Sequence, residues 1–176
     1  MRPSFNVLAG LALLSIPSVM ADCKLNNAIE ENEKTNDDRQ ELCLAEGSNI
    51  WTFALQVSEI GFPTFDGENA FAGITSRHAF ILYDDVCSRV GVYSPDNEGN
   101  DCGVPYYIEE DWLSHRLTIT GINFGVGDPS FAITYADNEY VTGRDGNECA
   151  DVSSGLRAEQ ACKATFSNYI AEEGSG

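Results

Sequence analysis

Alternation of apolar and polar residues with a period of two dominates the chain from residue 48 onward. In NIWTFALQV, Trp51, Phe53, Leu55 and Val57 fall on one face of an extended strand, and Thr52 and Gln56 fall on the other. Such alternation is typical of a half-buried β-strand. Further segments have strand length and composition: 78–86 (HAFILYDDV), 90–94 (VGVYS), 104–109 (VPYYIE) and 131–135 (FAITY).

The segment RLTITGINF, residues 116–124, predicts a strand with one interruption. Leu117 and Ile119 share a face, whereas Ile122 and Phe124 have the opposite parity. We therefore expect a β-bulge at Gly121 that resets the register. The following residues, GVGDPS, predict a hairpin loop that leads into the 131–135 strand.

Short strands separated by Gly, Pro, Asn and Asp favour an antiparallel β-barrel or β-sandwich over a βαβ design. The exception is SSGLRAEQACKATF, residues 153–166, where serines that can cap a helix precede good helix formers. We therefore expect a mainly β fold with at most one short C-terminal helix, over residues 153–163.

The N-terminus predicts the compartment. Arg2 precedes an apolar run over residues 5–17, and small residues follow before Ala21. This run is shorter than the ~20 residues that a transmembrane helix needs, and it matches a secretory signal peptide. We expect a signal peptide at 1–21, an acidic arm at 22–47, a single β-domain at 48–172 and a frayed tail at 173–176, in a secreted, extracellular protein.

The charge is strongly negative, because 28 acidic residues face 10 basic ones and the net charge is −18. Without Arg2 of the signal peptide the balance is 9 − 28 = −19. Such a charge repels phosphates, so neither nucleic acid nor an anionic membrane is an expected partner. A basic protein surface or a metal ion suits this charge better.

The cysteine count indicates three disulfides in an oxidising compartment. The six cysteines are Cys23, Cys43, Cys87, Cys102, Cys149 and Cys162. We expect sequence neighbours to pair, 23 with 43, 87 with 102 and 149 with 162, each bond adding roughly 3 kcal/mol in the chain-entropy model. A zinc site and a catalytic thiol are not expected, because no close C-x-x-C pair occurs.

No catalytic residue and no cofactor is predicted. The chain has two histidines, His78 and His115, and no G-x-S-x-G elbow. Glu109, Glu110 and Asp111 beside Trp112 form the best candidate for a sugar site, because glycosidases use paired carboxylates and aromatic rings support sugars. The competing interpretation is a charged loop with Trp112 packed into the core.

The stretch CSRVGVYSPDNEGNDC, residues 87–102, ends in an acidic tip. The tip residues are Asp96, Asn97, Glu98, Asn100 and Asp101. Asp96, Glu98 and Asn100 alternate as calcium ligands do, but the required Gly is displaced and neither the bidentate Glu nor flanking helices occur. We predict a recognition loop and no metal site, with calcium binding as the alternative.

Several of these features resemble the Alternaria major allergen family of fungal secreted proteins. Cys43 precedes EGSNIW and the strand that runs into VSEIGF, as a family cysteine precedes a Trp-led strand. Cys87 follows a strand, and Cys102 comes after a polar stretch. The segments LTITGINF and GDPSFAITYAD resemble the family's late strand pair, and CKATFSNYI resembles its terminal strand. The resemblance covers residues 43–170. Cys23, the arm and the expected helix depart from it.

The resemblance implies a β-barrel without catalytic residues and an effector or allergen-like role, including contact with plant defence proteins of the thaumatin-like class. It also implies a monomer or a homodimer linked through the early cysteine, here Cys43. We therefore expect a secreted, non-enzymatic fungal effector that binds a host or competitor protein, basic in charge. The alternatives are a carbohydrate-binding protein or small glycosidase, and a calcium-dependent extracellular structural or adhesion protein.

Overall fold

A computed structural model describes residues 23–28, 42–63, 71–95, 103–153 and 157–169. At residues 60–63, 71–76 and 157 it describes the backbone alone. The expected signal peptide, the C-terminal tail and the loop tip from Asp96 to Asp101 lie outside the described residues.

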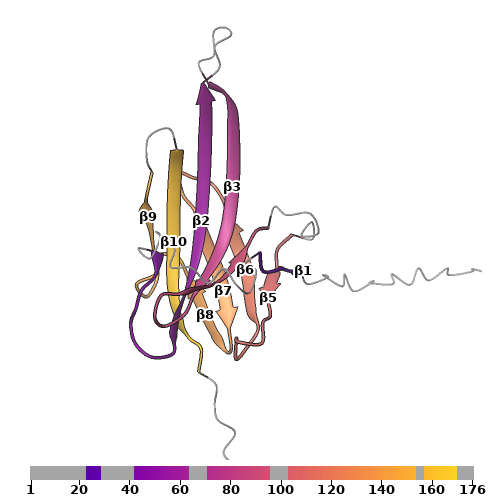
Figure 1. Cartoon of the computed structure of the whole chain (residues 1–176), viewed down its shortest axis with the longest axis vertical. Coiled ribbons are helices and arrows are strands. Elements are labelled where there is room, and N and C mark those ends of the chain that lie inside the picture. The colour runs from indigo at the N-terminus through magenta and orange to yellow at the C-terminus, as the bar shows by residue number, and fades with distance from the viewer. Residues whose placement is uncertain (1–22, 29–41, 64–70, 96–102, 154–156, 170–176) are drawn as a thin grey trace, which may run out of the picture.

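The described residues form two five-stranded sheets (Figure 1). Sheet A has the order β1 (Cys23–Lys24), β5 (Tyr106–Ile108), β6 (Leu117–Asn123), β7 (Ser130–Tyr135) and β8 (Asn138–Val141). Sheet B has the order β4 (Arg89–Tyr93), β3 (Phe71–Tyr83), β2 (Ile50–Pro63), β10 (Arg157–Ser167) and β9 (Glu148–Asp151). All described pairings are antiparallel except the one between β1 and β5.

The core lies between the two sheets, where the period-two alternation places the large apolar side chains. Phe53 and Leu55 of β2 are fully buried there, together with Ile133 and the nearly buried Phe131 of β7. The rings of Phe53 and Phe131 meet edge to face at 5.0 Å between centroids. Within the described chain no strand of one sheet pairs with a strand of the other, so the fold is a β-sandwich.

The expected β-bulge in β6 is confirmed. The register between β6 and β7 shifts between Ile119 and Gly121, so that Gly121 lies opposite Ala132. An inserted residue of this kind reverses the side-chain parity of the strand beyond it.

The expected C-terminal helix is wrong, because residues 157–167 form strand β10. This strand pairs with β2 from Arg157 opposite Ile60 to Ser167 opposite Ile50, and with β9 on its other edge. Cys162, Ala164 and Phe166 alternate into the core. Burial and two ladders of backbone hydrogen bonds override the local helix propensity.

The expected solvated arm is wrong at residues 23–28 and at the buried Leu42 and Cys43, whereas residues 45–47 are exposed as expected. Leu25 is fully buried in the core, and its N–H donates to the Tyr107 carbonyl of sheet A at 2.8 Å. The Asn27 side chain bonds to the backbone of Val90 and Val92 in β4, and the Ala28 N–H donates to the Val92 carbonyl at 2.8 Å. Residues 23–28, which we call the strap, therefore join both sheets along one side of the sandwich.

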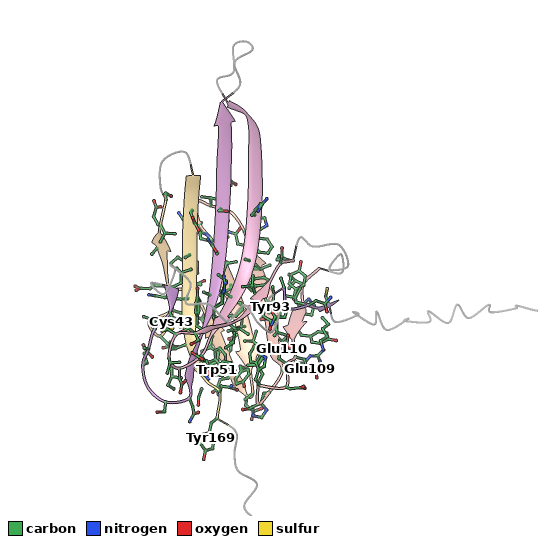
Figure 2. All side chains as sticks on the ribbon, in the orientation of Figure 1. Cys43, Trp51, Tyr93, Glu109, Glu110 and Tyr169 are labelled. Carbon is green, nitrogen blue, oxygen red and sulfur yellow. A yellow bond between two sulfur atoms is a disulfide. The ribbon has the colours of Figure 1, made fainter. Side chains whose placement is uncertain are left out.

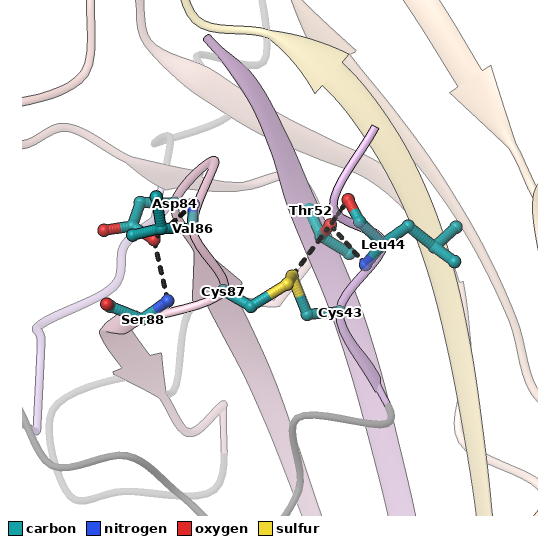
Figure 3. Close-up of a disulfide and its surroundings, with 7 residues drawn as sticks. All are labelled: Cys43, Leu44, Thr52, Asp84, Val86, Cys87 and Ser88. Carbon is teal, nitrogen blue, oxygen red and sulfur yellow. Dashed lines mark hydrogen bonds between the residues drawn. A yellow bond between two sulfur atoms is a disulfide. The ribbon is translucent and has the colours of Figure 1, made fainter. Parts of the chain in front are cut away.

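Two of the expected disulfides are wrong and one is confirmed. Cys149 pairs with Cys162, as expected, but Cys43 pairs with Cys87 in the turn between β3 and β4 (Figure 3). The pairs 23–43 and 87–102 are therefore excluded. Cys23 and Cys43 are kept apart because the strap holds Cys23 beside Tyr106 in sheet A, whereas Leu42 and Cys43 pack on the outer face of sheet B. Cys87 packs in the same outer cluster as Cys43, so these two cysteines pair with each other. Since Cys43 is bonded within its own chain, it cannot link two subunits.

Candidate functional site

Several connecting segments meet at the end of the sandwich that lies away from the tip of the β2–β3 ribbon (Figure 2). In sheet B this end contains Ile50, where β2 begins, opposite Ser167, where β10 ends. In sheet A it contains Leu117, where β6 begins, opposite Tyr135, where β7 ends. The segments are 44–49, 84–88, 109–116, 136–137 and 168–169, and we call them the acidic end.

Asn168 joins the two sheets at the acidic end. Its side-chain oxygen accepts hydrogen bonds from the Ser114 N–H, at 2.9 Å, and from the Tyr135 hydroxyl. Its side-chain N–H donates to the Trp112 carbonyl at 3.0 Å. The side chain is buried, so these bonds fix the 109–116 segment against the end of β10.

Aromatic and apolar side chains gather on the same end. Trp51 stacks on Trp112 with centroids 5.4 Å apart, and both rings are half-buried. Tyr169, which directly follows Asn168, is 60% exposed. Aromatic side chains that are partly exposed and held rigidly are enriched at protein–protein interfaces.

The turn at 84–88 adds a fixed apolar tip. The Asp84 carboxylate accepts from the N–H groups of Val86, at 3.1 Å, and Ser88, at 2.7 Å (Figure 3). The disulfide from Cys87 to Cys43 anchors the turn on sheet B. These constraints present Val86 with 71% of its surface exposed.

The acidic end carries a concentrated negative charge. Its segments contain seven carboxylates and a single Lys or Arg, which is Arg116. The carboxylates belong to Glu46, Asp84, Asp85, Glu109, Glu110, Asp111 and Asp137. Several also hold the loops: Asp85 accepts from the Asn49 N–H at 2.9 Å, and Glu46 accepts from the Thr165 hydroxyl at 3.1 Å.

Glu110 is hydrogen-bonded to a tyrosine of the core. The Tyr93 hydroxyl, on a fully buried ring of β4, donates to its carboxylate at 3.0 Å. Burial raises the pKa of the Tyr93 phenol above its ordinary value of 10.0, and the charge of Glu110 and this hydrogen bond raise the pKa further. The bond also ties sheet B to the segment that follows β5.

The candidate sugar residues differ in their exposure and in their contacts. Glu109 is exposed and lies 3.8 Å from the Lys24 ammonium, Asp111 is exposed, and Glu110 serves Tyr93 (Figure 2). Trp112 has one face against Trp51, so at most one ring face is left for a sugar. The structure places this cluster within the acidic end and assigns Trp112 a packing role there.

Each histidine ring packs against an aromatic side chain. His78 stacks on Phe124 with centroids 4.2 Å apart. The ring of His115 meets Tyr135 edge to face at 5.7 Å, and its backbone N–H donates to the Tyr135 hydroxyl at 3.2 Å. The Ser114 hydroxyl is buried and makes no hydrogen bond to either histidine.

The described ranges of the chain hold no group of three or more His, Cys, Asp or Glu side chains that could bind a metal ion. In the same part of the chain, no helix is long and apolar enough to cross a membrane. The recognition loop expected at Asp96 to Asp101 is not among these residues.

Sequence reasoning identified the acidic end only in part. It singled out Glu109 to Trp112, but it did not associate them with Trp51, Val86, Asn168 or Tyr169. The fold therefore defines a disulfide-linked β-sandwich with an acidic, aromatic end. No family model, no curated protein and no solved structure matches this chain.

Proposed function

We propose that this chain is an exported, non-enzymatic protein that binds a basic surface of a host or competitor protein through its acidic end. The observation that carries the proposal is the gathering of Trp51, Trp112, Tyr169 and Val86 among seven carboxylates on one end of a rigid sandwich. Buried or half-buried aromatic anchors with a charged rim are the usual anatomy of a protein interface.

Export is supported by the N-terminal sequence pattern and by the two disulfides, which form in oxidising compartments. The experiment is Edman sequencing of protein recovered from the culture medium. A mature N-terminus at Asp22 supports export through the signal peptide, and a chain that is retained inside the cell contradicts it.

Charge complementarity supports the choice of partner. The excess of carboxylates at the acidic end would accelerate encounter with a basic surface and would repel an acidic one. The resemblance to the Alternaria allergen family points to basic members of the thaumatin-like plant defence class as the first partner to test.

Binding can be measured by biolayer interferometry with a purified basic thaumatin-like protein, and with an acidic protein of similar size as the control. We expect affinity for the basic protein to fall steeply between low and high salt. The double variant Asp111→Asn/Asp137→Asn should weaken binding about tenfold, since two rim charges contribute roughly 1.4 kcal/mol together.

The matched control is Asp128→Asn. Asp128 is exposed in the turn between β6 and β7, at the other end of sheet A. This variant removes the same kind of charge and should leave binding unchanged. Equal binding of the basic partner by the wild-type chain, the double variant and Asp128→Asn would contradict the proposal. Binding whose affinity does not respond to salt would also contradict it.

A further inference from the structure

The ribbon formed by β2 and β3 extends beyond its neighbours in sheet B (Figure 1). Strand β10 begins at Arg157, opposite Ile60, and β4 ends at Tyr93, opposite Phe80. From residue 71 to residue 79, therefore, β3 pairs with β2 on one side and with no described strand on the other. A row of backbone groups on such an edge is a template for adding a strand.

Neighbouring hydrogen bonds show which backbone groups face outward. In an antiparallel sheet, alternate residues of a strand bond to opposite neighbours. The His78 carbonyl accepts from the Ser94 hydroxyl, at 3.4 Å, on the side of β4. The even-numbered residues of β3 share this direction, so Ile74 and Ser76 direct their N–H and C=O groups away from β2.

A second observation supports the same parity. The Val92 carbonyl of β4 accepts from Ala28 of the strap, so Val92 faces away from β3. Its opposite residue, Ile81, must then bond toward β2, as the alternation requires of an odd-numbered residue.

The composition of this edge differs from that of the rest of the chain. Residues 71–79, FAGITSRHA, contain no Asp or Glu, although the chain has 28 of them, and Arg77 is their one Lys or Arg. Natural edge strands are commonly protected by charges or prolines, whereas Ile74 and Thr75 are β-branched and favour pairing. The edge also lies away from the acidic end (Figure 1).

These features favour a second copy of the chain as the partner that pairs with this edge of β3. Two chains that each carry a net charge of −18 repel each other, so they can approach most closely along an edge strand whose own residues 71–79 contain no carboxylate. The nearest carboxylate in the ribbon's ladder is Glu59, which lies on β2 opposite Ser76. A two-fold axis is the commonest symmetry of homo-oligomers, and it makes the edge its own complement.

We propose that two copies pair along β3 in antiparallel register around an axis at Thr75. In this register Ile74 lies opposite Ser76 of the partner subunit, and both pairs of outward-facing residues can exchange backbone hydrogen bonds. Arg77 lies opposite Gly73 of the partner subunit, so the two guanidinium groups do not face each other. The two ribbons then form one continuous four-stranded sheet.

The first test is sedimentation velocity on the full exported chain across about 1 to 100 μM, a range that brackets weak homodimers. We expect a concentration-dependent dimer. Ser76→Pro removes an outward N–H that β2 does not use, and proline is tolerated on strand edges. It should give a monomer at every concentration, whereas Ser76→Ala should still dimerise.

A charge-swap pair keeps the proposal testable if the proline variant does not fold. Thr75→Glu and Thr75→Lys each place like charges opposite each other at the axis, so each should weaken the dimer at least tenfold. Mixing the two variants should restore a dimer, because unlike charges then meet.

Two results would overturn the proposal: a wild-type chain that stays monomeric throughout, or a mixture of the two Thr75 variants that does not associate. A foreign strand as the natural occupant would produce the first result. Binding of a basic partner at the acidic end is measured separately and does not depend on this outcome.

Discussion

Replacing Asn168 with alanine removes three side-chain hydrogen bonds that hold the 109–116 segment against the end of β10. The groups that lose their partner are the Ser114 N–H, the Tyr135 hydroxyl and the Trp112 carbonyl. The backbone bond from the Asn168 N–H to the Asn49 carbonyl, at 2.8 Å, is retained. The variant therefore tests the side chain alone.

The magnitude follows from the burial of these groups. A buried polar group that is left without a partner costs about 1–3 kcal/mol. The Tyr135 ring is nearly fully buried, whereas the bonds to Ser114 and Trp112 are part-buried and water can replace some of their energy. We therefore expect Asn168→Ala to lower the free energy of unfolding by about 3–5 kcal/mol.

The assay is urea unfolding at pH 7 without reductant, followed by tryptophan fluorescence, because Trp112 is bonded to Asn168 and stacks on Trp51. Tyr135→Phe is the comparison. It removes one of the three bonds to Asn168 and also the acceptor of the His115 N–H, and it should cost about 1–2 kcal/mol. A loss below about 1 kcal/mol for Asn168→Ala, or a loss equal to that of Tyr135→Phe, would refute this reasoning.

Three further predictions concern the core. Leu25→Ala should lower the free energy of unfolding by about 2–5 kcal/mol in urea titrations, because Leu25 is fully buried; a loss typical of a surface residue would contradict the strap. Gly91→Ala should destabilise by about 1–3 kcal/mol, since a Cβ there would lie 2.6 Å from the Tyr93 ring, whereas Gly127→Ala, with nothing within 4 Å, should be neutral in the same assay. The raised pKa of Tyr93 keeps the folded state protonated where the unfolded state ionises, so stability should fall as the pH rises above 10.0; unfolding midpoints that do not change there would contradict this.

The strands could be predicted because each packs one face on the core. Trp51, Phe53, Leu55 and Val57 alternate in the sequence because they all face the core, and the parity changes at Gly121 because the register shifts there. The segment at residues 157–167 could not be assigned in this way. Its alanines and glutamine favour a helix locally, and the pairing with β2 and β9 that overrides this preference is made by residues distant in sequence.

The strap and the disulfides also depend on contacts between residues that are distant in sequence. The average polarity of residues 22–47 conceals Leu25, Leu42 and the two cysteines, which are the buried residues among those of this stretch that the structure describes. Pairing by sequence proximity worked for Cys149 and Cys162, because they lie on adjacent paired strands. It failed for Cys43, which the outer face of sheet B brings to Cys87 across a separation of 44 residues.

The acidic end was largely invisible in the sequence for a related reason. Glu109 to Trp112 stood out because they are adjacent, whereas Trp51, Asn168 and Tyr169 come from other segments and meet only through the sheet ends. Asn168 in particular has no sequence signal, because its role depends on three groups between 33 and 56 residues away.

The central claim is that a basic partner binds at the acidic end, and a hydrogen-exchange footprint tests it most directly. The protein would be labelled alone and with a saturating amount of a basic thaumatin-like protein. We expect slower exchange in segments 44–49, 84–88 and 109–116, with no change in the turn between β6 and β7. Protection confined to the outer face of sheet A, or no protection at the acidic end of a bound complex, would contradict it.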